Sequence, residues 1–317
     1  MDLTNQILDA AKRIEPHIRR TYFHHSRPFS TMINGSVWFK LENIQLTGSF
    51  KVRGAMNKIL TLKDSKRSKG VIAASTGNHG AAVAFATGRL NIDCTIYVPD
   101  NSSKAKIDNM RNYGSRIKVY GSDCIESELK ARQVSSENGK PYVSPYNDLD
   151  VIAGQGTIGV EIESQCDRLD VLIVSVGGGG LIGGIGSYLK SIWPELIIIG
   201  CSPENSAVMI HSMRKGRLLS LDSKPTLSDG TAGGVEQDSI TFPICRSVID
   251  ETILLKEKEI RDAMNTYMKN ENQLLEGAAG TAVAALIRKK EELMGKKVGV
   301  LICGGNISPD TLRSVLV

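Results

Sequence analysis

Short runs of β-branched residues alternate with longer helical stretches along most of this chain, and this alternation constrains the fold more than any other feature. Such an order implies crossover connections and parallel sheets with both faces covered by helices. The predicted strands are 71–74, 94–98, 117–120, 171–176, 197–201, 252–255 and 298–303. The predicted helices are 51–62, 79–90, 122–138, 180–192 and 278–293. We therefore expect an α/β protein with two open, twisted, mostly parallel sheets.

Length and composition set broad limits. With 317 residues, 41% hydrophobic and 23% charged, the chain is large enough for two globular domains. The net charge of +5 is spread without long basic runs, so we expect no nucleic-acid partner. Six cysteines lie scattered without a CxxC pair, which argues against a zinc cluster or a disulfide scaffold. Because we find neither a signal peptide nor an apolar run long enough for a membrane span, we expect a cytoplasmic protein.

The longest glycine run, Gly177 to Gly180, follows a predicted strand and opens a predicted helix. Backbone amides at such a turn can approach an anion closely, and the helix dipole adds positive potential, so a phosphate is a natural ligand. No Gly-Lys-Ser/Thr follows, which excludes a P-loop. However, Gly178, Gly180 and Gly183 fit the G-x-G-x-x-G spacing, and an acid, Glu195, lies near the expected position. A nicotinamide-dependent dehydrogenase therefore stays open at this point.

A second segment, Thr47 to Ala55, surrounds Lys51 with glycine, serine and phenylalanine. A lone lysine at the start of a helix is most often a solvated charge. In apolar surroundings, however, a lysine loses its charge readily and can act as an imine-forming amine. Both interpretations of Lys51 fit the segment taken alone.

A third segment, Ser75 to Gly80, places hydroxyls, an amide and backbone donors at the start of a helix. This arrangement suits a carboxylate. It also suits an ordinary N-cap, which Ser75, Thr76 or Asn78 can supply. A fourth segment, Cys303 to Asn306, ends the last predicted strand with a turn and a buried cysteine.

Together and in this order, these segments resemble the fold-type II pyridoxal-phosphate family, in its threonine/serine dehydratase and serine racemase branch. The likeness covers nearly the whole chain, and several motifs in register favour this family over a dehydrogenase. The remaining segments that carry it are Lys40 to Asn43, Val98-Pro99 with Lys104, Tyr113-Gly114, Asp229-Gly230 and Glu276 to Gly280.

The resemblance implies roles toward the cofactor, pyridoxal 5'-phosphate. Lys51 would form a Schiff base with it and later move the proton at the substrate Cα. Phe50 would pack near the ring, and Asn78 would hydrogen-bond the phenolic oxygen. Cys303 stands where the family places serine or cysteine against the pyridine nitrogen, and such a neutral group favours prompt loss of a β-hydroxyl. The phosphate would be held by Gly177, Gly178, Gly179, Gly180 and Leu181.

Toward the substrate, the resemblance implies that Ser75, Thr76, Asn78 and His79 receive the carboxylate. Racemases of this branch commonly carry a serine where this chain has Thr76, as an acid or base on the face opposite the lysine. A threonine hydroxyl is restricted in rotation by its methyl group. Dehydration needs only the lysine face, so we rank it above racemisation, with Lys51 and Thr76 as the candidate catalytic residues.

Two further positions depart from the family pattern. Metal-activated members carry acidic residues where this chain has Ser202 and Val208, so we predict no metal site there. The irregular stretch 218–242 carries Glu236, which is either a solvated loop charge or a selector for a substrate bearing an amine or hydroxyl. This stretch resembles dehydratases from hydroxyectoine catabolism.

We therefore predict a homodimeric ammonia-lyase that converts a small 3-hydroxy amino acid, such as L-threonine or L-serine, to a 2-keto acid. The alternatives are a serine racemase, a β- or γ-replacement enzyme such as a cysteine or threonine synthase, and a cofactor-binding protein without robust catalysis. The predicted small domain, residues 48–147, is inserted into a large domain formed by 1–47 and 148–317.

Overall fold

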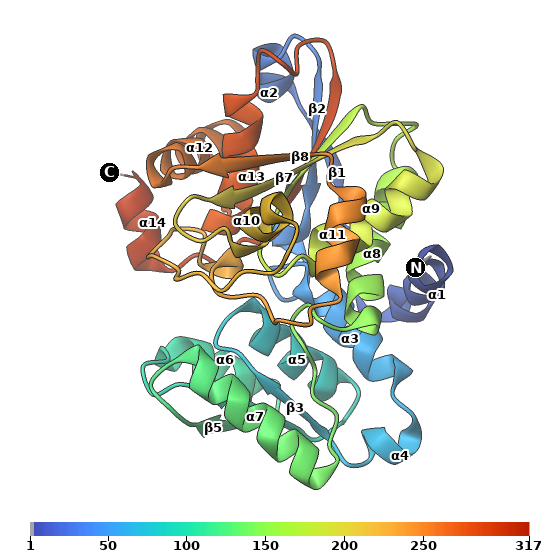
Figure 1. Cartoon of the computed structure of the whole chain (residues 1–317), viewed down its shortest axis with the longest axis vertical. Coiled ribbons are helices and arrows are strands. Elements are labelled where there is room, and N and C mark those ends of the chain that lie inside the picture. The colour runs from blue at the N-terminus through green and yellow to red at the C-terminus, as the bar shows by residue number, and fades with distance from the viewer. Residues whose placement is uncertain (1–2, 317) are drawn as a thin grey trace.

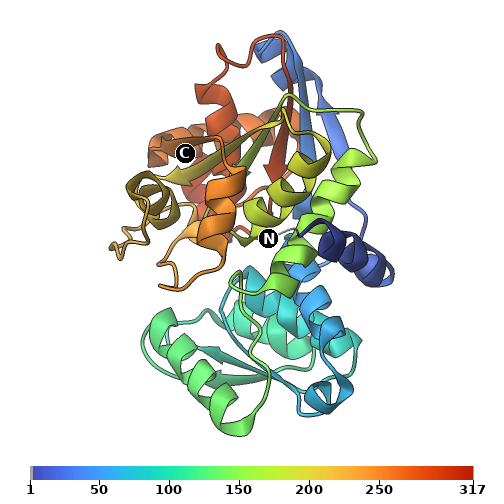
Figure 2. The same cartoon turned by 45° about the vertical axis from the view of Figure 1, so that its right-hand side comes forward.

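The structure, a computed structural model, describes residues 3–316 and divides into two lobes, each built on its own sheet (Figure 1). The large lobe has six strands in the order β1-β2-β9-β6-β7-β8, and the small lobe has three in the order β3-β4-β5. All pairings are parallel except that of β1 with β2. Figure 2 shows the same two lobes from a second direction. The predicted α/β fold with two mostly parallel sheets is confirmed.

The elements have the following bounds. The strands are β1 Phe23–Ser26, β2 Ser36–Leu41, β3 Val71–Ala74, β4 Cys94–Val98, β5 Arg116–Val119, β6 Val171–Ser175, β7 Ile197–Pro203, β8 Glu251–Leu255 and β9 Lys297–Ile302. The α-helices are α1 Thr4–Ile14, α2 Arg27–Met32, α3 Lys51–Thr61, α4 Asp64–Arg67, α5 Asn78–Arg89, α6 Lys104–Asn112, α7 Cys124–Asn138, α8 Leu149–Glu163, α9 Gly180–Ile192, α10 Val208–Lys215, α11 Thr241–Val248, α12 Glu257–Glu271, α13 Gly277–Arg288 and α14 Pro309–Leu316. Three 3₁₀ turns are η1 Glu15–His17, η2 Glu42–Ile44 and η3 Asp229–Thr231.

Each predicted strand is present; the elements that the pattern did not predict include β1, β2 and the helices α6, α8 and α12. Strand β1 is a four-residue edge strand with two exposed histidines, so it lacks the apolar alternation of a typical strand. Helix α8 is glycine-rich and buried around most of its circumference, so it shows no amphipathic stripe. Strands β3 to β5 all fall inside the range 48–147, while the exact division of the domains stays a prediction.

Helix α3 lies at the junction of the two lobes. Its apolar residues Val52, Met56 and Ile59 belong to the buried cluster of the small lobe, which is separate from the larger cluster around the six-stranded sheet. The same helix packs against α5 in the small lobe and against α8. Lys51, its first residue, is therefore placed between the lobes. None of the helices within residues 3–316 is long and apolar enough to cross a membrane.

Four charged side chains form a buried ion cluster beside Lys51: Lys40, Glu42, Arg53 and Glu161. The guanidinium of Arg53 donates to both oxygens of Glu42 at 2.8 Å and to Glu161 Oε1 at 2.8 Å. Lys40 Nζ donates to Glu161 Oε2 at 2.5 Å. These contacts join β2, η2, α3 and α8, with two cations balancing two carboxylates, so the start of α3 is fixed to the large lobe.

Replacing one member of this cluster should destabilise the fold strongly. Arg53→Met leaves Glu42 buried without its guanidinium, which should cost about 3–5 kcal/mol of unfolding free energy. Arg116→Met, which removes an exposed ion pair with Asp93 in the small lobe, is the matched control and should cost less than about 1 kcal/mol. Urea unfolding of both cofactor-free variants measures the difference. Equal losses would show that the buried ion cluster contributes no more than a surface pair.

Candidate active site

Backbone hydrogen bonds connect the turn before α3 to the turn after β9, and they position the helix start that carries Lys51. The amide of Phe50 donates to the Cys303 carbonyl at 3.0 Å, and Gly305 N donates to Gly48 O at 2.9 Å. Gly48 adopts a φ of +71°, and a Cβ there would collide with the Asn306 side chain, so only glycine fits. The predicted Lys51 and Cys303 segments, more than 250 residues apart in sequence, are thereby brought together.

The amine of Lys51 is enclosed and held by a backbone carbonyl. Lys51 Nζ donates to Pro145 O at 2.8 Å and lies 5.2 Å from the centroid of the Phe50 ring. Burial lowers the pKa of Lys51 to about 8, although Cys303 and Glu276 act in the opposite direction. An amine with this pKa is neutral in a useful fraction of molecules near pH 7, so it can act as a nucleophile and as a base.

The predicted glycine loop turns from β6 into α9 as expected. Gly179 has a φ of +85°, and Cβ atoms at Gly177 and Gly178 would overlap the backbone of Thr231 and the ring of Tyr146. Thr241 Oγ1 donates to Gly178 O at 2.6 Å, so this carbonyl of the loop has a protein partner. The first-turn amides of a helix, here including that of Leu181, have no intrahelical acceptors and favour an anion.

Asn78 is held by two residues of the large lobe. Its Nδ2 donates to Glu276 Oε1 and Oε2 at 3.0 and 2.8 Å, and its Oδ1 accepts from Asn306 Nδ2 at 2.7 Å. The sequence motifs include Glu276 and Asn306 but assign them no role. Their position in those motifs was the available signal, because nothing local shows that these side chains meet Asn78.

The pKa values of Glu276 and Cys303 are both raised above their ordinary values. Burial raises the pKa of Glu276 to about 7; Asn78 opposes this shift, and Asp229 adds to it. Burial also raises the pKa of the Cys303 thiol well above its usual value, with Glu276 as a second cause. Cys303 Sγ lies 3.9 Å from Glu276 Oε1, as a donor. Cys303 is therefore a neutral thiol, not a thiolate.

The segment Ser75 to His79 connects β3 to α5. Ser75 Oγ accepts from Gly77 N at 3.1 Å, while Thr76 is half-buried. His79 Nε2 bonds the Val143 carbonyl at 2.8 Å, and burial lowers the pKa of His79 to about 3, helped by Lys51. This ring is neutral, and its Nε2 is already bonded to the Val143 carbonyl. Any contact of His79 with a carboxylate would therefore be made by its backbone amide at the start of α5. The predicted carboxylate role of this segment stays a prediction.

Ser202 and Val208, the positions expected to lack metal ligands, lie in β7 and at the start of α10. Ser202 Oγ donates to the Val176 carbonyl at 2.6 Å. Across residues 3–316, no group of three or more His, Cys, Asp or Glu side chains is placed to hold a metal ion.

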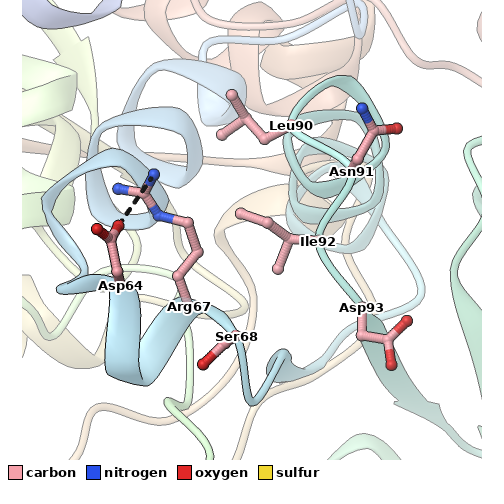
Figure 3. Close-up of a pocket in the computed structure, with 7 residues that line it drawn as sticks. All are labelled: Asp64, Arg67, Ser68, Leu90, Asn91, Ile92 and Asp93. Atoms are coloured by element: carbon pink, nitrogen blue, oxygen red, sulfur yellow. Dashed lines mark ion pairs between the residues drawn. The ribbon is translucent and has the colours of Figure 1, made fainter.

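Two hollows lie at different distances from this chemistry. One, shown in Figure 3, lies in the small lobe and is lined by none of the predicted site residues. The other has a volume of about 410 Å³ and runs between Lys106 of α6 and residues of the large lobe that include Asp229, Glu276 and Asn306. Only the second hollow reaches a side chain that contacts a predicted site residue, Asn78.

The fold and this site define an α/β protein with a partly buried lysine of lowered pKa and a glycine-rich turn between two lobes. Comparison gives the family: the model for pyridoxal-phosphate dependent enzymes matches residues 14–304, and the chain belongs to that family. The resemblance stated from the motifs is thereby confirmed.

Relatives and solved structures place it more closely. The chain is 39% identical over 310 residues to the L-threonine ammonia-lyase of Thermotoga maritima, covering 98% of this chain and 77% of the relative. It is 40% identical to a catabolic L-threonine dehydratase of Staphylococcus aureus, with 98% and 90% coverage. Maize serine racemase has a TM-score of 0.92 at 31% identity, covering 98% of this chain and 95% of that one. Threonine deaminase isoform 2 of Solanum lycopersicum has a TM-score of 0.94 at 31% identity, covering 99% of this chain and 92% of that one.

The residues present fit pyridoxal 5'-phosphate, the cofactor of this family. A phosphate needs amide donors without intervening side chains, and Gly177 to Gly179 carry none; a Cβ at these positions would collide with Thr231, Tyr146 or Cys245. An aldehyde needs a neutral amine, which the lowered pKa of Lys51 provides. Cys303 offers a neutral thiol at the end of β9, beside the turn that carries Lys51.

The raised pKa of Glu276 predicts a pH-dependent stability that Glu276→Gln removes. A carboxyl with a pKa of 4.5 unfolded and about 7 folded stabilises the folded state fully below pH 4.5 and loses this effect as the pH rises through 7. Between pH 4.5 and 8, wild type should therefore lose up to about 3 kcal/mol more than Glu276→Gln.

Chemical denaturation of the cofactor-free proteins at several pH values measures this difference. The exposed Glu291→Gln is the control and should follow wild type at every pH. A constant offset between wild type and Glu276→Gln would contradict the raised pKa.

Proposed function

We propose that this chain is a pyridoxal-phosphate-dependent ammonia-lyase that converts L-threonine, and L-serine as a second substrate, to the 2-keto acid and ammonia. The observation that carries the proposal is Lys51, a buried amine with a pKa near 8 at the start of α3. It is supported by two relatives, a threonine ammonia-lyase and a threonine dehydratase, each matched over 98% of this chain. In the net reaction, the water lost on elimination returns in hydrolysis.

When bound, pyridoxal phosphate supplies the electron sink that makes the substrate Cα–H acidic and allows the β-hydroxyl to leave. The protein's own groups do the remaining work. Lys51, in its neutral form, would take the proton from Cα on its side of the site. The amides of Gly177 to Leu181 would hold the phosphate, and Asn78, fixed by Glu276 and Asn306, would orient the ring through its phenolic oxygen.

Cys303 would determine how long negative charge persists near Cα. Its thiol is neutral and buried, so it places no carboxylate beside the ring nitrogen that would keep a proton there. With negative charge near Cα only weakly stabilised, departure of the hydroxyl would be favoured over return of the proton. This supports elimination over racemisation.

Racemisation is the second candidate, since maize serine racemase shares this fold at 31% identity. It needs an acid or base on the face opposite Lys51, for which this chain offers the half-buried Thr76 hydroxyl. We also propose that the protein acts in the cytoplasm as a homodimer. Light scattering coupled to size exclusion measures the oligomeric state directly.

The central test combines a spectrum with product detection. Wild-type protein with cofactor should show a visible absorbance band that shifts with L-threonine and L-serine while keto acid accumulates. Lys51→Ala should remove the band and lower turnover at least about 1000-fold, because it removes both the attachment point and the base. Lys66→Ala, at an exposed position in the small lobe, is the matched control and should change neither.

Other outcomes point elsewhere. A shifted band with D-serine but no keto acid would indicate a racemase. Keto acid from neither amino acid, together with turnover of O-acetylserine with sulfide or of O-phosphohomoserine, would indicate a replacement enzyme. No band at any cofactor concentration would overturn the proposal.

A further inference from the structure

Glu236, whose role the sequence left open, contacts α7 of the small lobe and the segment that leads out of that lobe. It lies on the loop between α10 and α11, which passes along the small lobe (Figure 1). Its Oε1 lies 2.8 Å from Arg132 Nη2 on α7, and its Oε2 accepts from Asn147 Nδ2 at 2.8 Å. Its backbone amide donates to the Tyr146 hydroxyl at 2.9 Å.

Arg132 is held in place by contacts other than its ion pair with Glu236. Its guanidinium carbon lies 4.4 Å from the centroid of the Tyr142 ring, and its Nε and Nη2 donate to Glu128 Oε1 at 2.9 and 2.8 Å. A guanidinium stacked and bonded in this way loses little further freedom when it pairs with a second carboxylate. The side chains of Arg132 and Glu236 are 37% and 28% exposed, so salt only partly screens the pair.

Residues 145–147, which include the two hydrogen-bond partners of Glu236, contact the site in two places. The Pro145 carbonyl accepts from Lys51 Nζ at 2.8 Å, and the Tyr146 ring lies against the backbone of Gly178. Asn147 Oδ1 also accepts from Ile240 N at 2.9 Å, which ties the segment back to the same loop. The placement of residues 145–147 therefore affects both the lysine and the phosphate-binding turn.

We propose that Arg132 and Glu236 form an interlobe clamp that positions residues 145–147, and through them Lys51 and the glycine loop, only while the lobes are in contact. Glu236 is on this view a positioning residue that does not contact the substrate side chain, because its carboxylate lies against Arg132 through Oε1 and accepts from Asn147 through Oε2. The effect on catalysis rests on the proposed function, whereas the effect on cofactor retention does not.

A double-mutant cycle tests the clamp with Arg132→Met, Glu236→Gln and the double variant. The dissociation constant of the cofactor is measured by titrating the cofactor-free proteins with it and following absorbance. KM and kcat are measured with L-threonine as the substrate. Each single variant should raise both the dissociation constant and KM about tenfold and leave kcat within about twofold. The double variant should be no worse than either single one, which is a coupling of about 1.4 kcal/mol. Arg132→Lys should recover most of the loss.

The controls separate the clamp from a general loss of stability. Arg116→Met, which breaks an exposed ion pair in the same lobe, should leave both constants unchanged. Glu236→Gln keeps an oxygen for Asn147, so its cofactor-free form should unfold within a few degrees of wild type. If Arg132→Met does not fold, the constants of Glu236→Gln alone test the clamp.

Independent, multiplying effects in the double variant, or unchanged constants in the single ones, would overturn the clamp. A Glu236→Gln variant that changes the ranking of amino-acid substrates would also overturn it, since Glu236 would then contact the substrate. If wild type forms no keto acid from any amino acid, the proposed function fails, while the cofactor cycle still decides on the clamp.

Discussion

The buried ion cluster at the start of α3 is the constraint on which the rest of the site depends. Arg53 lies two residues beyond Lys51, on the same turn of helix, and its guanidinium is fully buried between Glu42 and Glu161. Desolvating such charges costs several kcal/mol for each ion, and only good geometry with further hydrogen bonds offsets that cost. The structure provides both, since Thr21 and Thr157 also bond the cluster. A helix start held this way has essentially one position, while the amine at the end of the Lys51 side chain is held separately by the Pro145 carbonyl.

The same exclusion of water gives the neighbouring groups their chemistry. Burial lowers the pKa of Lys51 to about 8 and that of His79 to about 3, and it raises the pKa of Glu276 to about 7. Each of these shifts favours the uncharged form, as desolvation requires. Near pH 7 Lys51 therefore remains protonated in most molecules, with a minor neutral fraction, and Glu276 is ionised in about half of them. Backbone amides at the glycine loop add positive potential that does not titrate.

Local sequence was enough to locate the parts of the site that one segment builds alone. The turn at Gly177 to Gly180 and the lysine opening α3 are visible because strand, turn and helix follow one another directly. The partners of Asn78 were not predictable, since Glu276 lies 198 residues away, and Glu236 meets Asn147 across 89. The partner of the His79 ring was equally unpredictable, since the Val143 carbonyl that it contacts lies 64 residues away. Such roles depend on which buried groups meet, and periodicity carries no information about that.

The distribution of polar and apolar contacts indicates how the two lobes can move. Each lobe keeps its own apolar cluster, while several contacts near the site that cross between lobes are polar, including Asn78 with Glu276 and Arg132 with Glu236. Separating the lobes there exposes groups that water can satisfy, whereas opening either lobe exposes apolar surface. Separating the lobes there therefore costs less than opening either lobe, although α3 packs on both of them. Because burial lowers the pKa of Lys51 in this arrangement, a separation that admits water would raise that pKa toward its ordinary value.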